Sequence, residues 1–199
     1  MHRSYFFVRH GRAVYQEPGF DHRDYPRGTD WPLAPVGHDQ ARAVRAPLLR
    51  RGVERVVSSR LERAKQTAGY IAADTLPYDH RWDALNELEP KKLRRSRKQR
   101  PEWVDGVAMA RAMRAFSRGR PTGEWDIEGV AQRVDDVLER LDALAEPRLA
   151  VVCHGFWIWM LAVRLGGPPR IGWVDNTSVT RVDADGRGRR RLVSFAARL

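Results

Sequence analysis

Three short apolar segments, each followed directly by polar residues, constrain the fold of this chain most. They cover residues 5–8, 53–57 and 149–153, and they lead into Arg9-His10-Gly11, Ser58-Ser59-Arg60 and His154-Gly155. Short apolar segments of this kind are typical of strands that are buried on both faces of a parallel sheet. The sequence therefore predicts at least three such strands, with polar side chains at their carboxyl ends.

Stretches with helical spacing separate these runs. The clearest covers 127–145, where one apolar stripe repeats at helical intervals. Further helices are expected over 37–51, 61–74 and 101–116, although Pro47 weakens the first of these predictions. Residues 178–183 and 191–195 flank an Asp-Gly turn and predict a hairpin. This alternation favours an α/β fold, in which residues 1–199 form a single three-layer domain with a mostly parallel central sheet flanked by helices.

The composition fits a soluble domain with anionic partners. Lys and Arg number 36 against 25 Asp and Glu, which gives a formal net charge of +11 and favours phosphorylated substrates, nucleic acid or other acidic ligands. Residues 91–100 hold seven of these positive charges, within an expected flap or insert at about 88–120. A run of this kind is most often a solvated segment, and the alternative is a basic flap that faces an anionic substrate.

Cys153 is the only cysteine, so an internal disulfide and any multi-cysteine metal site are excluded. The apolar runs are too short for a signal peptide or a membrane span. We therefore expect a cytoplasmic protein without a membrane partner, and the sequence leaves its oligomeric state open.

The polar residues at the strand ends carry the chemistry. Ligands of open α/β sheets bind beyond the carboxyl ends of the strands, so we expect Arg9, His10, Arg60 and His154 to converge there. Guanidinium groups bind phosphate oxygens through charge-assisted hydrogen bonds, and a neutral imidazole can attack phosphorus. Gly11 and Gly155 would allow the backbone to approach an oxyanion closely. Together these groups indicate phosphoryl transfer.

At this point the sequence resembles the histidine phosphatase superfamily, the phosphoglycerate mutase-like group with an Arg-His-Gly motif. Residues 30–41 resemble its D-x-P-L-[ST]-x-x-G-x-x-Q-A segment, 58–68 resemble its helix entry, and 151–155 resemble the strand of its second histidine. Asn176 and Thr177 resemble a later Asn-x-[ST] turn of the family. The second motif contains both Arg60 and Arg63, and of these we assign Arg60 as the phosphate ligand.

The resemblance implies a phosphoglycerate mutase-like fold and a covalent mechanism. His10 would attack phosphorus to give a phosphohistidine, which water would then hydrolyse, while Arg9, Arg60 and His154 hold the transferred group. Glu87, in a segment that resembles the family's L-x-E element, would be the general acid, with Glu89 as the alternative. The resemblance implies no cofactor and no metal ion. The substrate would be a phosphorylated small molecule or a phosphoprotein.

The chain also departs from the family pattern. Arg12 and Ala13 replace the acid and small hydroxyl residue that often follow the first motif, Gln16 stands where an Asn is frequent, and Ala34 replaces a helix-capping Ser or Thr. Three alternative functions stay open at this stage: mutase-type phosphoryl transfer, dephosphorylation of a protein phosphohistidine, and non-catalytic binding of an acidic partner. Nucleic-acid binding ranks below catalysis, because a decayed enzyme would not be expected to keep the whole cluster.

Overall fold

The computed structural model describes the chain except for residues 1, 22, 24–28, 88–114, 116–126 and 168–173. The described strands form one six-stranded sheet in the order β3-β2-β4-β1-β5-β6. Their bounds are Arg3–Arg9 for β1, Arg55–Ser58 for β2, Tyr78–Asp79 for β3, Arg148–Cys153 for β4, Val179–Ala184 for β5 and Arg190–Ala197 for β6. The first four strands of this order run parallel, and β5 and β6 are antiparallel to their neighbours.

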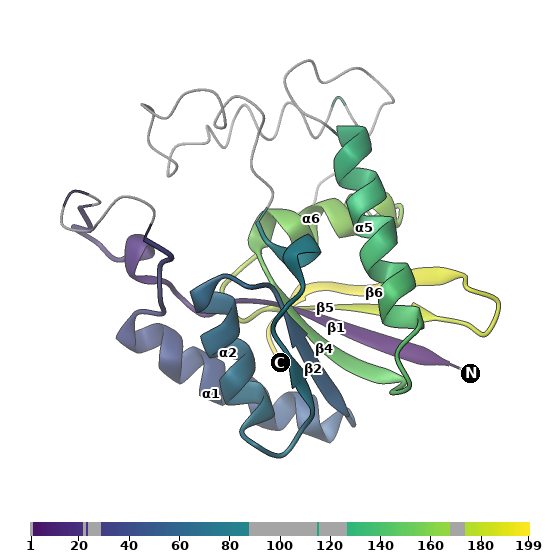
Figure 1. The fold of residues 1–199 in the computed structure, drawn as a ribbon, viewed down its shortest axis with the longest axis horizontal. Coiled ribbons are helices and arrows are strands. Elements are labelled where there is room, and N and C mark those ends of the chain that lie inside the picture. Colours follow the sequence, from purple (N-terminus) through teal and green to yellow (C-terminus); the bar gives the residue numbers. More distant parts are fainter. Residues whose placement is uncertain (1, 22, 24–28, 88–114, 116–126, 168–173) are drawn as a thin grey trace.

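Four α-helices are described, and they cover both faces of the sheet (Figure 1). One layer consists of α1 (Pro35–Arg50) and α2 (Glu62–Ala72), and the other consists of α5 (Ile127–Asp142) and α6 (Gly155–Arg164). Two short 3-10 helices, η1 (Val14–Gln16) and η3 (Asp83–Leu85), lie in the connections. The expected three-layer α/β architecture is confirmed.

The alternation of side chains along the central strands divides the core into two parts. On β1, Tyr5 and Phe7 face a core shared with α5 and α6, whereas Phe6 and Val8 face a core shared with α1 and α2. All four side chains are buried. Because successive strand residues point to opposite faces, only a strand covered by helices on both sides reads as an unbroken apolar run. This is why residues 5–8 and 149–153 form unbroken apolar runs in the sequence.

The helix predictions hold where the structure describes the residues. The stretch 37–51 is helical from Pro35, and Pro47 lies inside this helix without ending it. The N-cap of α1 is Ala34, which makes no side-chain capping bond, as the loss of the family's hydroxyl implied. The predicted hairpin is the β5–β6 pair. The expected helix at 101–116, apart from residue 115, lies outside the described residues, and so do the basic run 91–100 and Glu89.

The sheet topology brings two distant parts of the chain together. Strands β1 and β4 are parallel neighbours, with Arg9 opposite Cys153, so that His10 and His154 follow directly at the same edge. Strand β2 pairs with β4 on the other side and adds the 58–60 segment to this edge. Within the described part of the chain, no helix is long and apolar enough to cross a membrane.

Candidate active site

Two buried imidazoles form the centre of the candidate site. The ring centroids of His10 and His154 are 5.1 Å apart, and the side chains are 1% and 0% exposed. Neither ring points into the apolar core, since each makes polar contacts through both nitrogens. The structure therefore brings together the two histidines that the sequence placed at separate strand ends.

Arg63 lies between these histidines and bonds to both. Its Nε donates to Nε2 of His10 at 3.1 Å, and its Nη2 contacts Nδ1 of His154 at 3.2 Å. An arginine can only donate, so both of these ring nitrogens are acceptors. The hydrogen of His10 is then on Nδ1, 2.7 Å from the carbonyl oxygen of Gly11. The lone pair of His10 Nε2 is consequently directed toward the guanidinium.

The same argument fixes the tautomer of His154. With Nδ1 accepting from Arg63, its hydrogen is on Nε2, 2.8 Å from the hydroxyl oxygen of the buried Ser59. Ser59 follows β2, so three strands contribute to the polar cluster. Ser59 lies inside the motif that begins at residue 58, but its contact with His154 was not expected from the sequence.

The environment keeps both rings neutral. Burial lowers the pKa of His10 well below its ordinary value, and the positive charges of Arg63 and Arg9 lower it further. Burial also lowers the pKa of His154, with added effects from Arg63, His10, Arg9 and Arg133. A neutral imidazole has a free nitrogen lone pair at neutral pH, which is the form required of a nucleophile.

Arg9 is the second buried guanidinium of the site. Its Nη1 donates to the carbonyl oxygen of Val174 at 2.5 Å. Burial lowers the pKa of Arg9, while Tyr15 and Glu87 raise it through their charge. A Cβ atom on Gly155 would lie 3.3 Å from Nε of Arg9, so the glycine leaves room for this side chain at the start of α6. Arg9 and Gly155 thus lie close together.

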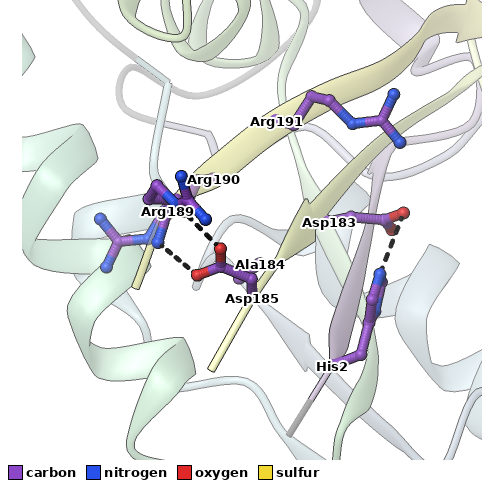
Figure 2. Close-up of a pocket in the computed structure, with 7 residues that line it drawn as sticks. All are labelled: His2, Asp183, Ala184, Asp185, Arg189, Arg190 and Arg191. Carbon is purple, nitrogen blue, oxygen red and sulfur yellow. Dashed lines mark hydrogen bonds and ion pairs between the residues drawn. The ribbon is translucent and has the colours of Figure 1, made fainter. Parts of the chain in front are cut away.

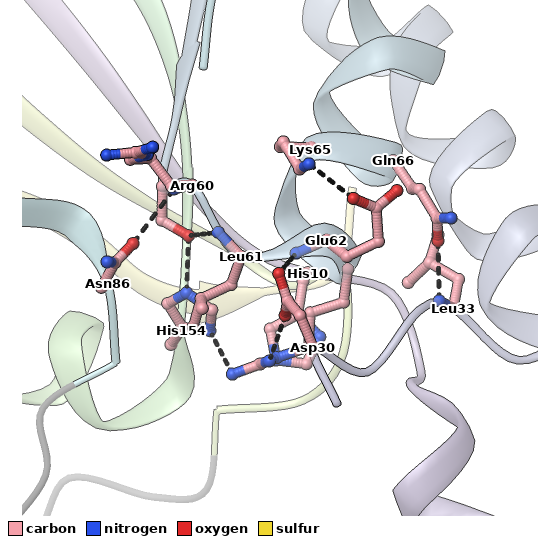
Figure 3. Close-up of polar contacts among 12 residues, drawn as sticks. His10, Asp30, Leu33, Arg60, Leu61, Glu62, Lys65, Gln66, Asn86 and His154 are labelled. Carbon is pink, nitrogen blue, oxygen red and sulfur yellow. Dashed lines mark hydrogen bonds and ion pairs between the residues drawn. The ribbon is translucent and has the colours of Figure 1, made fainter. Parts of the chain in front are cut away.

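Arg60 does not join the cluster, which corrects the arrangement expected from the sequence. Its side chain is 60% exposed and pairs with Asp83 at 3.3 Å, and Figure 3 shows it directed away from the histidines. The cause is the start of α2 at Glu62. Residue 63 falls on the inward face of the first turn, and residue 60 precedes the helix in an exposed bend. Arg63, the other arginine of this motif, occupies the central place instead.

Glu87 lies at the amino end of α6. Its Oε1 accepts a hydrogen bond from the backbone N–H of Trp157 at 3.3 Å, two residues after the helix begins. The side chain is half-buried, and its charge acts on both Arg9 and Cys153. The Glu87 carboxylate is therefore within electrostatic reach of the buried Arg9 guanidinium.

Gly11 has a packing role that the sequence did not reveal. A Cβ at this position would lie 2.5 Å from the carbonyl oxygen of Gly37, so the two backbones touch. Its N–H donates to the hydroxyl of Thr67 at 3.0 Å. The N–H was expected to approach an oxyanion, but here it is occupied by Thr67, and the Gly11 carbonyl orients His10.

Asp30 completes the surroundings of Arg63. One carboxylate oxygen accepts from the backbone N–H of Glu62 at 2.8 Å, and the other is 3.9 Å from Nη1 of Arg63. Asp30 thus binds the first turn of α2 and partly balances its arginine (Figure 3). In the sequence, Asp30 is marked only as the first residue of the 30–41 motif. Asn176 Nδ2 donates to the His10 carbonyl at 3.0 Å, which ties the 176–177 turn to the site.

A separate cavity of about 260 Å³ lies at the opposite end of β1, near the β5–β6 turn (Figure 2). His2, Asp183, Asp185 and three successive arginines line it, and none of the residues of the histidine cluster does. In the ranges that the structure describes, no group of three His, Cys, Asp or Glu side chains could hold a metal ion. Cys153 is buried in the core, as expected, and burial raises the pKa of its thiol.

Comparison with known proteins agrees with the geometry. A family model for the histidine phosphatase superfamily, branch 1, matches residues 5–197. A solved structure named mycobacterial hydrolase 1 is 25% identical with a TM-score of 0.73, and both chains are covered completely. Mycobacterial glucosyl-3-phosphoglycerate phosphatase is also 25% identical over all of both chains, with a TM-score of 0.69.

A phosphoserine phosphatase from Entamoeba histolytica is similar at the level of the fold. It is 21% identical over 98% of this chain and 96% of its own, with a TM-score of 0.70. No curated protein sequence matches the chain. The fold and the family description therefore agree on phosphatase or mutase chemistry.

Proposed function

Because the chain belongs to branch 1 of the histidine phosphatase superfamily, we propose that it hydrolyses phosphomonoesters through a phosphohistidine formed on His10. The observation that carries this proposal is the buried cluster in which Arg63 contacts both imidazoles. Nε2 of His10 holds the lone pair, so this atom is the nucleophile.

In the first half of the reaction, Nε2 of His10 bonds to phosphorus while the bond from phosphorus to the leaving oxygen breaks. The phosphoryl group takes the place of Nε2 as the acceptor of the Arg63 N–H. Arg63 and Arg9 then donate to the equatorial oxygens, and His154, whose ring centroid is 5.1 Å from that of His10, lies beside them. These prearranged donors stabilise the charge that develops on the transferred group.

Glu87 serves as the general acid in this scheme and gives its proton to the leaving oxygen. In the second half, Glu87 accepts a proton from water as the water attacks phosphorus and the N–P bond breaks. Phosphate leaves and His10 returns to its neutral form. The arginines supply the positive charge that a metal ion supplies in many phosphatases, and we propose that no metal is required.

The substrate class follows from the buried arginines and from the relatives. Two buried guanidiniums beside the histidines suit a phosphate dianion, and a similar protein of known structure is a glucosyl-3-phosphoglycerate phosphatase. We propose a phosphorylated small molecule as the substrate.

The test is hydrolysis of 4-nitrophenyl phosphate by the wild type and by His10→Ala, with and without EDTA. Wild-type turnover should be insensitive to EDTA, and His10→Ala should be inactive. Acid-labile phosphate should accumulate on the wild type after rapid quenching with excess substrate. Full activity of His10→Ala would overturn the proposal, and isomerisation of a phosphoglycerate faster than phosphate release would assign the chain to the mutases.

A further inference from the structure

We infer that Arg133, on the far side of the sheet from Arg63, is a positioning residue for Glu87, and this inference rests on the proposed function. Arg133 lies on α5, and its guanidinium is bonded to the turn that precedes Glu87. Its Nε donates to the carbonyl oxygen of Ala84 at 2.7 Å. Its Nη2 donates to the carbonyl oxygens of Asp83 at 2.9 Å and Asn86 at 2.7 Å.

These three bonds fix the path of the backbone rather than a side chain. They engage three of the four residues directly before Glu87, so the direction in which residue 87 leaves the turn depends on them. Lysine could not replace this arrangement, because a single ammonium lacks the planar fork of an arginine. Leu85 at the centre of the turn is 0% exposed, and its packing limits other arrangements of the turn.

The opposite side of the turn is attached to α6. Nε1 of Trp157 donates to the carbonyl oxygen of Ala84 at 2.8 Å, so this oxygen accepts from both Trp157 and Arg133. The backbone N–H of the same tryptophan donates to the Glu87 carboxylate. Trp157 of α6 thus bonds both to the turn and to the Glu87 carboxylate. The bonds from Arg133 hold the turn against Trp157.

In kcat/KM, which reports the steps up to release of the alcohol, the position of this carboxylate acts through protonation of the leaving oxygen, whereas its later role with water affects kcat. A general acid contributes most when the leaving group is a poor one, because a good leaving group departs without a proton. A displaced Glu87 should therefore slow the hydrolysis of esters of weakly acidic alcohols and leave the hydrolysis of 4-nitrophenyl phosphate nearly unchanged. A general loss of folding or of phosphate binding would slow both classes equally.

The experiment compares kcat/KM for 4-nitrophenyl phosphate, phenyl phosphate and glycerol 2-phosphate. For Arg133→Met we expect a loss of about 10- to 100-fold on the two poorer leaving groups, the size typical of a misplaced catalytic group, and less than about threefold on 4-nitrophenyl phosphate. Arg133→Lys, which keeps the charge, should show the same dependence on the leaving group with a smaller loss. This variant replaces Arg133→Met in the comparison if Arg133→Met does not fold.

Arg140→Met is the matched control. Arg140 lies on the same helix seven residues later, over the ring of Trp82 at 3.9 Å, and its side chain is 53% exposed. It makes no contact with the carbonyl groups of the turn. This variant should change none of the three rates by more than about twofold, as for an exposed residue outside the site.

A double variant separates this inference from the proposed function. If Arg133 acts through Glu87, then Arg133→Met should add little to the loss already caused by Glu87→Gln. An equal loss on all three substrates, or full additivity with Glu87→Gln, would overturn the inference. If Glu87→Gln itself shows no leaving-group dependence, the assignment of Glu87 as the acid fails; a wild type inactive on every ester defeats the proposed function.

Discussion

The choice between the two arginines of the 58–68 motif can be tested directly by Arg63→Met and Arg60→Met. Arg63 directs two N–H groups at the ring nitrogens that surround the reaction centre, and its side chain is only 9% exposed. Loss of one such donor to a developing oxyanion typically lowers kcat by about 10²–10³-fold. Because Arg63 offers two, we expect a loss of at least about 10³-fold in Arg63→Met.

Arg60→Met should behave very differently. The variant removes an exposed ion pair with Asp83, worth about 1 kcal/mol or less, which is a factor of about five. The backbone N–H of residue 60, which donates to the side chain of Asn86 at 3.0 Å, is retained. We therefore expect the two variants to differ by at least about two orders of magnitude in kcat, measured with 4-nitrophenyl phosphate at saturating substrate.

The pH profile of Arg63→Met provides an independent readout. The nucleophile must be neutral, so kcat/KM rises with pH through the pKa of His10. Arg63 is one cause of the low pKa of that ring, after burial. Its removal should raise this pKa and move the acidic limb of the profile to higher pH. A larger loss in Arg60→Met than in Arg63→Met, or an unmoved acidic limb, would refute the placement of Arg63 at the centre.

Three further predictions concern the support of the site. Gly37→Ala should strongly lower the midpoint of thermal unfolding, since its Cβ would lie 2.0 Å from the carbonyl oxygen of Arg12; an unchanged midpoint would contradict this close approach. The folded-state pKa values of His10 and His154 are lowered, so below about pH 6.5 the unfolded state binds more protons than the folded state. As the pH falls further, each histidine should therefore reduce the free energy of unfolding by up to about 1.4 kcal/mol per pH unit. Urea titrations should show this slope reduced in His10→Asn, and an equal slope in both proteins would count against neutral burial. Ser59→Ala should lower kcat by about tenfold, the scale of one lost buried hydrogen bond, while Ser59→Thr should keep more activity because it retains a hydroxyl. Equal kcat values for Ser59→Ala and Ser59→Thr would show that the hydroxyl does not support His154.

The parts of the fold that could be predicted from the sequence are those that depend on local pattern. Strands buried on both faces leave unbroken apolar runs, and the residues that follow them share one edge of the sheet. This reasoning placed His10 and His154 in one cluster although they lie in different parts of the chain. The stripe of α5 was similarly visible, because one face of that helix packs against the sheet.

The remaining features depend on where an element begins or on what it touches. Arg60 and Arg63 differ by three positions, and only the start of α2 at Glu62 decides which of them faces inward. In the sequence, Arg133 is indistinguishable from the other charged residues on the polar face of its helix. Only its bonds to backbone carbonyl oxygens in the structure set it apart. The contact between Gly11 and Gly37 joins residues of different elements, so no local pattern marks it.

The parallel pairing of β1 with β4 has a consequence for how activity is gained and lost. Residues 10 and 154 are separated by 144 positions, and they meet only when these two central strands are in register. A contact at this separation forms late and slowly, because a long loop must first be closed. Recovery of phosphatase turnover during refolding would therefore report completion of the sheet itself, and denaturant should abolish turnover and strand content in a single transition.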